Sequence, residues 1–278
     1  MVEYRLIKVK TALSKSNLPD LDYALNPYIG CQHSCIYCYS PDFTRYSDVA
    51  ENWGSKVLIK ENIVEVLKRE VRSLSKGIVG VSTITDPYQP IEAKMKLTRE
   101  CIKVLSNSGF KVSIQTKSTL ILRDSDIINP KNFDVGVTIT TMRSEVAREI
   151  EPNAPPPRER LKILEYFSRR GVETWLFLGP IIPKINDDEE QLREVVEDAS
   201  KIKTEIVYDR LNVKPLMLRN MRRKWSFQID IREVVRLSYN DNYYIKISNT
   251  IERLCRRYGV KCSPAFTYKH TRKLTDFI

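Results

Sequence analysis

Short apolar segments alternate with helical patterns through the middle of the chain, and this alternation limits the possible folds more than any other feature. Ile63, Val66 and Leu67 recur at helical spacing, and a buried-strand pattern follows them. Six strands are predicted: one near 24–29, IVGVSTIT from Ile78, FKVSIQT from Phe110, DVGVTIT from Asp134, ETWLFLG from Glu173 and EIVYDRLNV from Glu205. Such alternation favours parallel strands joined by helical crossovers, so we expect an α/β sheet or barrel.

The helices between these strands have recognisable ends. Thr98 is expected to cap a helix that carries Ile102 and Leu105, and Gly109 to end it. Further helices are predicted over 158–170 and 187–203, and a charged helical region from Ser226 onward. Six strands are fewer than the eight of a complete barrel, but functional loops should still gather at the carboxyl ends of the strands.

The charge balance bears on the partners of the chain. Lysine and arginine outnumber aspartate and glutamate by 46 to 35, a net charge of +11, which attracts polyanions such as nucleic acid. The stretch LRNMRRKWSF sets Trp225 beside basic residues, which suits phosphate contact and base stacking or else forms a solvated basic turn. No segment has the roughly 20 apolar residues of a membrane span, and no signal peptide is evident. We therefore expect a cytoplasmic protein without a membrane partner.

Three of the six cysteines lie within one short segment, NPYIGCQHSCIYCYS. Cys31, Cys35 and Cys38 are spaced C-x3-C-x2-C, so one loop can present three thiolates to one inorganic centre. Structural zinc and electron-transfer sites usually have four protein ligands, whereas three leave one position open to a small molecule. A zinc site would need a fourth ligand, such as His33 or a distant cysteine. Three core cysteines without metal are the remaining alternative.

The motif C-x3-C-x2-C with Tyr37 before its third cysteine resembles the signature of the radical S-adenosylmethionine (SAM) superfamily. The flanking segments NPYIGC and CYS, with TDPYQPIE, LTR, TKS, EP-A-P-R and GPIIP, resemble the spore photoproduct lyase-like branch over about residues 22–220. The resemblance implies an α/β fold, a partial (β/α)6 TIM-type barrel of parallel strands with a helical C-terminal extension. The implied divisions are an N-terminal extension over 1–21, a radical SAM core over 22–220 and the helical extension over 221–278.

The resemblance also implies the cofactors and the chemistry. A [4Fe-4S] cluster would be held by Cys31, Cys35 and Cys38, and SAM would bind its open iron. Reductive cleavage of SAM would give a 5′-deoxyadenosyl radical that abstracts hydrogen from a substrate. The electron would come from an external donor of the flavodoxin or ferredoxin type. The protein would orient these groups and exclude water.

Five residues correspond to SAM-contacting positions of the family. Tyr37 and Tyr39 would lie against the adenine and the cluster edge, Thr85 against the methionine moiety, Lys117 near the SAM carboxylate, and Thr138 near the ribose. Each also has a simpler interpretation, as a packing tyrosine, an ordinary strand threonine or a solvated lysine. The adjacent carboxylates of TDPYQPIE, Asp86 and Glu92, are expected to cap loops and are assigned no chemical step.

The sequence departs from the photoproduct lyases at one point. Those enzymes carry a hydrogen-donating cysteine near the second strand end, where this chain has Ser82, Thr83 and Ile84. Photoproduct repair by that route is therefore not expected. The substrate stays open between a nucleic acid and a protein or small metabolite. A zinc-containing nucleic-acid binding module without catalysis is the alternative from another class.

The other cysteines and the histidines are less informative. Cys101 is expected in the core, because it lies on the apolar face of its predicted helix. Cys255 and Cys262, spaced C-x6-C, suit a local disulfide or two buried thiols. A second cluster is a further alternative, but two thiolates fall short of its usual four ligands. The two histidines, His33 and His270, are expected to be peripheral rather than catalytic.

Overall fold

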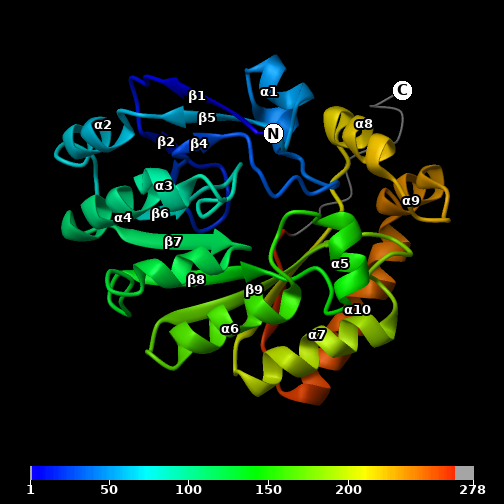
Figure 1. Cartoon of the computed structure of the whole chain (residues 1–278). Helices are drawn as coiled ribbons and strands as arrows, with labels where there is room; N and C mark the ends of the chain where they lie inside the picture. The colour runs from blue at the N-terminus through cyan, green and yellow to red at the C-terminus, as the bar shows by residue number, and fades with distance from the viewer. Residues whose placement is uncertain (1, 267–278) are drawn as a thin grey trace.

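The computed structural model describes residues 2–266, and its largest feature is a curved eight-stranded sheet with helices along its outside (Figure 1). The strand order is β11-β10-β9-β8-β7-β6-β3-β2. These strands are β2 (Leu13–Lys15), β3 (Tyr23–Leu25), β6 (Ile78–Val81), β7 (Lys111–Thr116), β8 (Phe133–Thr138), β9 (Glu173–Ile181), β10 (Glu205–Arg210) and β11 (Cys262–Pro264). All neighbours run parallel except β2 and β3. The predicted partial barrel of parallel strands is confirmed.

The segment near 24–29 differs from its prediction, because it forms two short strands instead of one. β3 ends at Leu25 in the large sheet, and β4 (Tyr28–Ile29) then joins a three-stranded sheet of order β1-β5-β4. Its other members are β1 (Glu3–Ile7) and β5 (Lys56–Lys60). The sequence analysis did not predict β1, β2, β5 or β11. β2 and β11 have three residues each, too few for a pattern, and β1 is largely exposed.

The helices that connect the strands agree with the predicted order. The α-helices are α1 (Ser47–Glu51), α2 (Ile63–Glu70), α3 (Glu92–Met95), α4 (Leu97–Asn107), α5 (Ser144–Ile150), α6 (Pro157–Ser168), α7 (Glu189–Lys201), α8 (Pro215–Lys224), α9 (Ile231–Ser238) and α10 (Asp241–Tyr258), and the 3-10 helices are η1 (Ser40–Phe43) and η2 (Thr119–Asp124). None of the helices within 2–266 is long and apolar enough to cross a bilayer.

The predicted cap of α4 is wrong. Thr98 lies inside the first turn, and Lys96, in the left-handed region at φ 55°, is the N-cap residue. The backbone N–H of Thr98 donates instead to the Glu92 carboxylate at 3.0 Å, and its hydroxyl donates to the Pro87 carbonyl at 2.7 Å. The Glu92 carboxylate, at the start of α3, thus accepts a backbone N–H that a capping side chain would otherwise bind.

Two parts of the core matter for the site. The main core packs the large sheet against α2, α4, α6, α7 and α10. A separate cluster packs the segment of the clustered cysteines, through Cys35, Ile36 and Tyr37, against Met217 and Met221 of α8. Asp42 of η1 accepts the backbone N–H groups of Leu216 at 2.8 Å and Met217 at 2.9 Å. The C-terminal helices therefore pack directly on the cysteine segment.

Candidate active site

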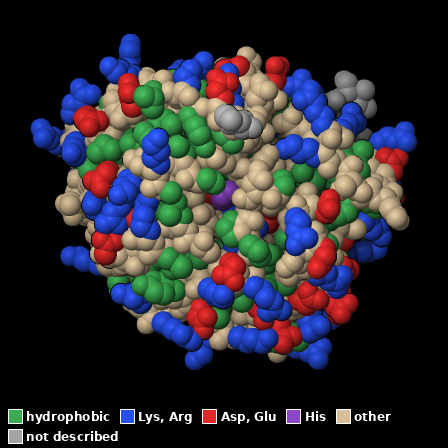
Figure 2. All heavy atoms as spheres, in the orientation of Figure 1, with side chains coloured by type: hydrophobic (Ala, Val, Ile, Leu, Met, Phe, Trp, Pro, Cys, Tyr) green, Lys and Arg blue, Asp and Glu red, His purple; other side chains and the backbone are tan. Residues whose placement is uncertain are grey.

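The cysteine loop, residues 31–38, leaves β4 through a glycine that no other residue can replace. Gly30 has φ +91°, and a Cβ there would lie 2.3 Å from the Lys56 carbonyl oxygen. The Gly30 carbonyl accepts the Thr85 hydroxyl at 2.7 Å and the Gln89 side-chain amide at 3.0 Å. These bonds join the start of the loop to the segment that follows β6. Figure 2 shows the corresponding face of the molecule hollowed near its middle, with a histidine at the bottom.

The three thiols of the loop share one buried environment. Cys31 and Cys35 are buried, Cys38 is half-buried, and all three are free. Burial raises the pKa of each thiol, to about 12 for Cys35. The charges of Asp86, Cys35 and Cys38 raise that of Cys31 further, so the sulfurs lie within electrostatic reach of one another. Metal ligation is a way to stabilise thiolates in such a place.

Hydrogen-bond donors surround Cys38. Burial raises the pKa of this thiol, whereas the Ser40 hydroxyl and N–H, Lys117 and the Trp53 indole lower it. Trp53 Nε1 is buried, and its N–H acts on the Cys38 sulfur with no closer acceptor among the described residues. An indole N–H beside a cysteine sulfur suits an iron–sulfur cluster, whose sulfurs accept such bonds. The donor set therefore fits a cluster.

The same side chains do not fit a single metal ion. Across residues 2–266, no three His, Cys, Asp or Glu side chains are gathered closely enough to hold one ion. A zinc ion needs its ligands to converge on one point. A cluster offers each cysteine its own iron, so the sulfurs need not converge.

Lys117 and Thr85 both lie close to the cysteine loop. The Lys117 ammonium is 5.8 Å from the Tyr37 ring centroid, and the Lys117 backbone N–H donates to Asp86 at 2.8 Å. Burial lowers the pKa of Lys117, but Cys35 and Glu151 outweigh burial and raise it overall. The structure thus keeps a charged ammonium beside the thiols. The Thr85 hydroxyl, by contrast, already donates a hydrogen bond to the Gly30 carbonyl oxygen.

Tyr39 and Thr138 lie at opposite extremes of exposure. Tyr39 is 42% exposed, donates to the Thr83 carbonyl at 2.8 Å and packs edge-on against Phe43. Thr138, at the end of β8, is buried, and its hydroxyl accepts the Gln115 side-chain amide at 3.0 Å. The Thr138 carbonyl accepts a hydrogen bond from Arg160 at 3.2 Å.

His33 is central to the loop rather than at its periphery. It is 2% exposed, and its Nδ1 lies 3.3 Å from an Asp86 carboxylate oxygen. Asp86 also accepts the Thr116 hydroxyl at 2.7 Å and the Tyr88 N–H at 2.9 Å, which makes it a loop cap as expected. Burial works to raise the pKa of Asp86, but His33 and the N–H and O–H donors hold it well below its usual range. His270 lies outside the described residues.

A buried group that the sequence analysis did not single out by residue, Glu151 with Arg160, also contacts the loop. The Tyr37 hydroxyl donates to Glu151, and Arg160 lies 2.6 Å from the second oxygen of that carboxylate. The quoted EP-A-P-R motif contains Glu151 and was the available signal. Its partners could not be read from the sequence, because the contact joins positions far apart in the chain.

The basic stretch on α8 is less available for stacking than its sequence suggested. Trp225 packs in the small core with Phe227, and its indole donates to the Ile229 carbonyl at 2.8 Å. Lys224 donates to the Ser34 hydroxyl at 2.6 Å, inside the cysteine loop. Arg222 and Arg223 are exposed.

The remaining cysteines lie elsewhere. Cys101 is fully buried in the main core, as expected. The Cys255 thiol of α10 and the Cys262 thiol of β11 are hydrogen-bonded to each other, and both are free. Cys262 pairs in register with Ile206, near the amino end of β10. The two thiols therefore lie at the amino-terminal ends of the parallel strands, opposite the carboxyl ends.

Comparisons with known proteins agree with this geometry. A model of the Radical SAM superfamily matches residues 25–196. An uncharacterized protein of Methanocaldococcus jannaschii is 34% identical over 189 residues, which is 68% of this chain and 71% of that protein. An uncharacterized protein of Mycobacterium tuberculosis is 30% identical over 207 residues, 70% of this chain and 61% of that protein.

Solved structures share the fold. A spore photoproduct lyase variant matches with a TM-score of 0.75 at 13% identity, over 95% of this chain and 82% of that one. A second variant of that enzyme, with bound AdoMet and dinucleoside spore photoproduct, matches with a TM-score of 0.75 at 12% identity and the same coverage. A radical SAM methyltransferase from Sphaerobacter thermophilus matches with a TM-score of 0.57 at 13% identity, over 91% of this chain and 67% of that one.

Proposed function

Because the chain belongs to the radical SAM superfamily and is an enzyme of that class, we propose that Cys31, Cys35 and Cys38 hold a [4Fe-4S] cluster that binds SAM. That cluster, when reduced by a flavodoxin- or ferredoxin-type donor, supplies the electron that cleaves SAM to a 5′-deoxyadenosyl radical for hydrogen abstraction. The observation that carries this proposal is the set of three thiols on one loop, two buried and one half-buried, with the Trp53 indole N–H beside Cys38.

The residues around the thiols have separate tasks in this proposal. Lys117 offers its ammonium to the SAM carboxylate, since a charge-assisted bond of this kind is strong where water is scarce. Tyr37 and Tyr39 flank the adenine, Thr85 holds the loop near the methionine end, and Thr138 lies toward the ribose. Burial of the thiols and of Tyr37 excludes water from the reacting atoms.

For the substrate, we propose a nucleic acid first. The net charge of +11 supports a polyanion, and a structurally similar spore photoproduct lyase was solved with a dinucleoside photoproduct bound. The Ser82, Thr83 and Ile84 stretch lacks the hydrogen-donating cysteine, so a reaction other than photoproduct repair is expected. A protein or small metabolite is the second candidate, favoured because the Trp225 indole and the Lys224 ammonium are already hydrogen-bonded within the chain, to Ile229 and Ser34.

SAM cleavage tests the proposal. Anaerobically reconstituted protein with dithionite is expected to form 5′-deoxyadenosine, and the Cys31→Ala variant to form none. Lys117→Met should raise the KM for SAM by about tenfold or more through loss of a charged hydrogen bond, whereas Lys103→Met on the outer face of α4 should not. Cleavage by a chain without the three cysteines would contradict the assignment.

Salt dependence separates the two substrate candidates. If nucleic acid is the substrate, binding of a fluorescent single strand should weaken steeply as salt rises, because phosphate contacts release counterions. If the strand binds weakly even at low salt, and its affinity does not change as the salt concentration rises, the second candidate is favoured. The Arg222→Ala and Arg223→Ala pair should reduce the salt slope if α8 contacts the phosphates.

A further inference from the structure

Residues 150–153, here called the strap, run along the cysteine loop and bind it at several points. The Ile36 N–H donates to the Ile150 carbonyl at 2.9 Å, and the Asn153 N–H donates to the His33 carbonyl at 3.3 Å. The Asn153 side-chain amide donates to the Gln32 carbonyl at 2.9 Å. These bonds fall on both sides of Cys35, so the strap restrains the part of the loop that carries the ligands.

One charged side chain of the strap, Glu151, reaches the loop between its last two cysteines. Glu151 is 1% exposed, and it accepts the hydroxyl of Tyr37, which lies directly before Cys38. Its partner Arg160 is also 1% exposed, at an N–O distance of 2.6 Å. A buried carboxylate is tolerated only where such partners satisfy it.

Arg160 fixes the position of this carboxylate relative to the barrel. Its Nε donates to the Pro155 carbonyl at 2.6 Å, and its Nη1 donates to the Thr138 carbonyl at the end of β8 at 3.2 Å. Burial works to raise the pKa of Glu151, but Arg160 and Lys117 outweigh burial and hold it below its usual range. The carboxylate is thus charged, and it is held from α6 and β8 at once.

We propose that Glu151, held by Arg160, is a positioning residue for the cluster, which acts through Tyr37 to keep the cysteine loop in the shape that receives iron and sulfide. The proposal rests on the function proposed above, because it concerns how firmly that cluster is held. Groups behind metal ligands commonly alter metal affinity by about 10- to 100-fold when they are removed. An effect of that size is expected here.

The chain offers a matched control in Tyr28. Tyr28 is fully buried and donates its hydroxyl to Glu92, which is paired with Arg123 at 2.8 Å. Tyr28→Phe and Tyr37→Phe therefore remove the same chemical group from the same kind of partner. Only Tyr37 lies within the cysteine loop.

The experiment compares these two variants with the unaltered chain after anaerobic reconstitution. Urea unfolding of the metal-free proteins measures stability, and release of iron to a ferrous chelator measures how firmly the cluster is held. Both variants should lower the urea midpoint by similar amounts. Tyr37→Phe should release iron about 10- to 100-fold faster and alter the EPR spectrum of the reduced protein, while Tyr28→Phe should match the unaltered chain.

Equal iron release by both tyrosine variants, or release by Tyr37→Phe at the unaltered rate, would overturn the proposal. If Tyr37→Phe does not fold, Asn153→Ala carries the test, because that exposed position removes a strap contact without opening the core. Its iron release should then be severalfold faster, and an unchanged rate would equally overturn the proposal. If the unaltered chain takes up no cluster, the proposed function itself has failed.

Discussion

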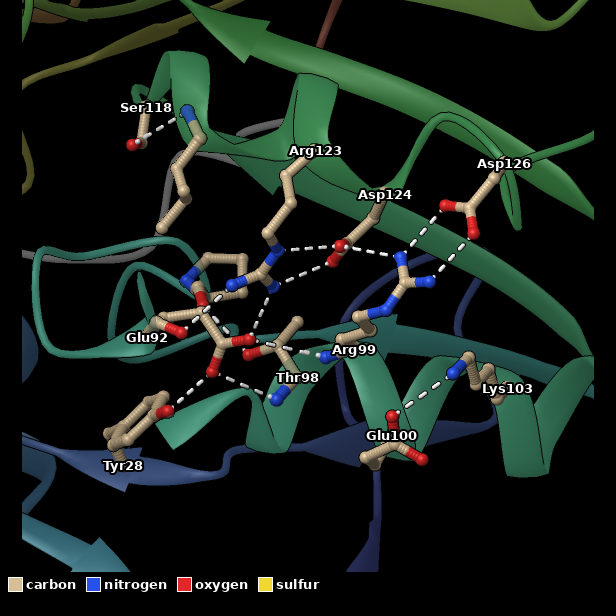
Figure 3. Close-up of polar contacts among 12 residues, drawn as sticks. Tyr28, Glu92, Thr98, Arg99, Glu100, Lys103, Ser118, Arg123, Asp124 and Asp126 are labelled. Atoms are coloured by element: carbon tan, nitrogen blue, oxygen red, sulfur yellow. Dashed lines mark hydrogen bonds and ion pairs between the residues drawn. The ribbon is translucent and has the colours of Figure 1, made fainter. Parts of the chain in front are cut away.

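Two buried groups of a tyrosine, a glutamate and an arginine stand at the carboxyl ends of the strands, and they differ in what they hold. The first, Tyr28 with Glu92 and Arg123, lies between the loops that follow β6 and β7 (Figure 3). The second, Tyr37 with Glu151 and Arg160, holds the cysteine loop. Similar chemistry thus stabilises the frame in one place and positions candidate ligands in the other.

The first group continues to the surface, whereas the second is closed. Arg123 also contacts Asp124 at 2.7 Å, Asp124 lies 2.9 Å from Arg99, and Arg99 contacts Asp126 at 2.6 Å (Figure 3). Positive and negative side chains alternate along this series of ion pairs, so each charge has a partner of opposite sign. In the second group, Lys117 is the additional cation. Its charge interacts with Cys35 and Glu151, and no series of ion pairs continues from it through the described residues.

The largest expected change in stability comes from removing the carboxylate of the first group. Glu92→Gln leaves the Arg123 guanidinium with one carboxylate fewer and should lower the free energy of unfolding by about 3–5 kcal/mol, as for other broken buried pairs. Urea unfolding of the metal-free chain measures this loss. The iron content per folded molecule should stay unchanged. Loss of the cluster with little loss of stability would break the distinction between the two groups.

Lys60 sharpens the comparison, because it is a largely buried charge outside both groups that has no ion pair within residues 2–266. Burial, with a smaller effect of Arg45, lowers the pKa of Lys60 to about 8. The folded chain therefore binds fewer protons than the unfolded chain between about pH 8 and 10.5, and stability should rise with pH in that window. Lys60→Met should stabilise the chain by about 3 kcal/mol at pH 7.

Urea unfolding of Lys60→Met and the unaltered chain at a series of pH values measures this difference. The advantage of the variant should shrink from pH 8 upward and disappear near pH 11. An advantage that is constant across this range would mean that packing, and not the charge of Lys60, is responsible.

A smaller effect is expected from the pair of thiols, Cys255 and Cys262, at the amino-terminal ends of the strands. Cys255 donates to Cys262, which lowers the pKa of Cys262 and favours its attack in disulfide formation. Oxidation by diamide, which takes up the two electrons and two protons, should close a short loop and stabilise the chain by about 2 kcal/mol. Urea unfolding of a Cys31, Cys35 and Cys38→Ala chain with and without diamide measures this, and Cys262→Ser should abolish the gain.

The smallest effect is expected from an exposed ion pair. Arg169 and Glu165 are 2.5 Å apart on α6, but their side chains are 76% and 42% exposed. Solvent screens such pairs, so Arg169→Ala should change the free energy of unfolding by less than about 0.5 kcal/mol. A loss as large as that of Glu92→Gln would show that burial is not what separates these pairs.

The sequence predicted the elements whose burial leaves a pattern. The strands from Ile78 to Glu205 were found because parallel strands covered on both faces are continuous apolar runs. The cysteine motif likewise identified the loop that carries the three thiols, because its spacing is local. β1 and β5 were missed, since their pairing joins segments about fifty residues apart and β1 faces solvent.

Contacts between distant side chains were the part that could not be predicted. The Glu151 carboxylate meets Tyr37 across more than a hundred residues, and nothing in either local pattern shows this. The misplaced helix cap at Thr98 has a similar cause, because the Glu92 carboxylate of α3 accepts the backbone N–H of Thr98. The stretch around Trp225 was expected to be either a stacking surface or a solvated turn, whereas Trp225 is half-buried and packs against Phe227.

The most direct test of the account is the iron and sulfide content of anaerobically reconstituted protein, with EPR spectra of its reduced form recorded with and without SAM. The account predicts about four irons per chain, a reduced-cluster signal that SAM changes, and loss of both in the Cys31, Cys35 and Cys38→Ala variant. A colourless protein that keeps zinc, or a cluster retained by the triple variant, would contradict it.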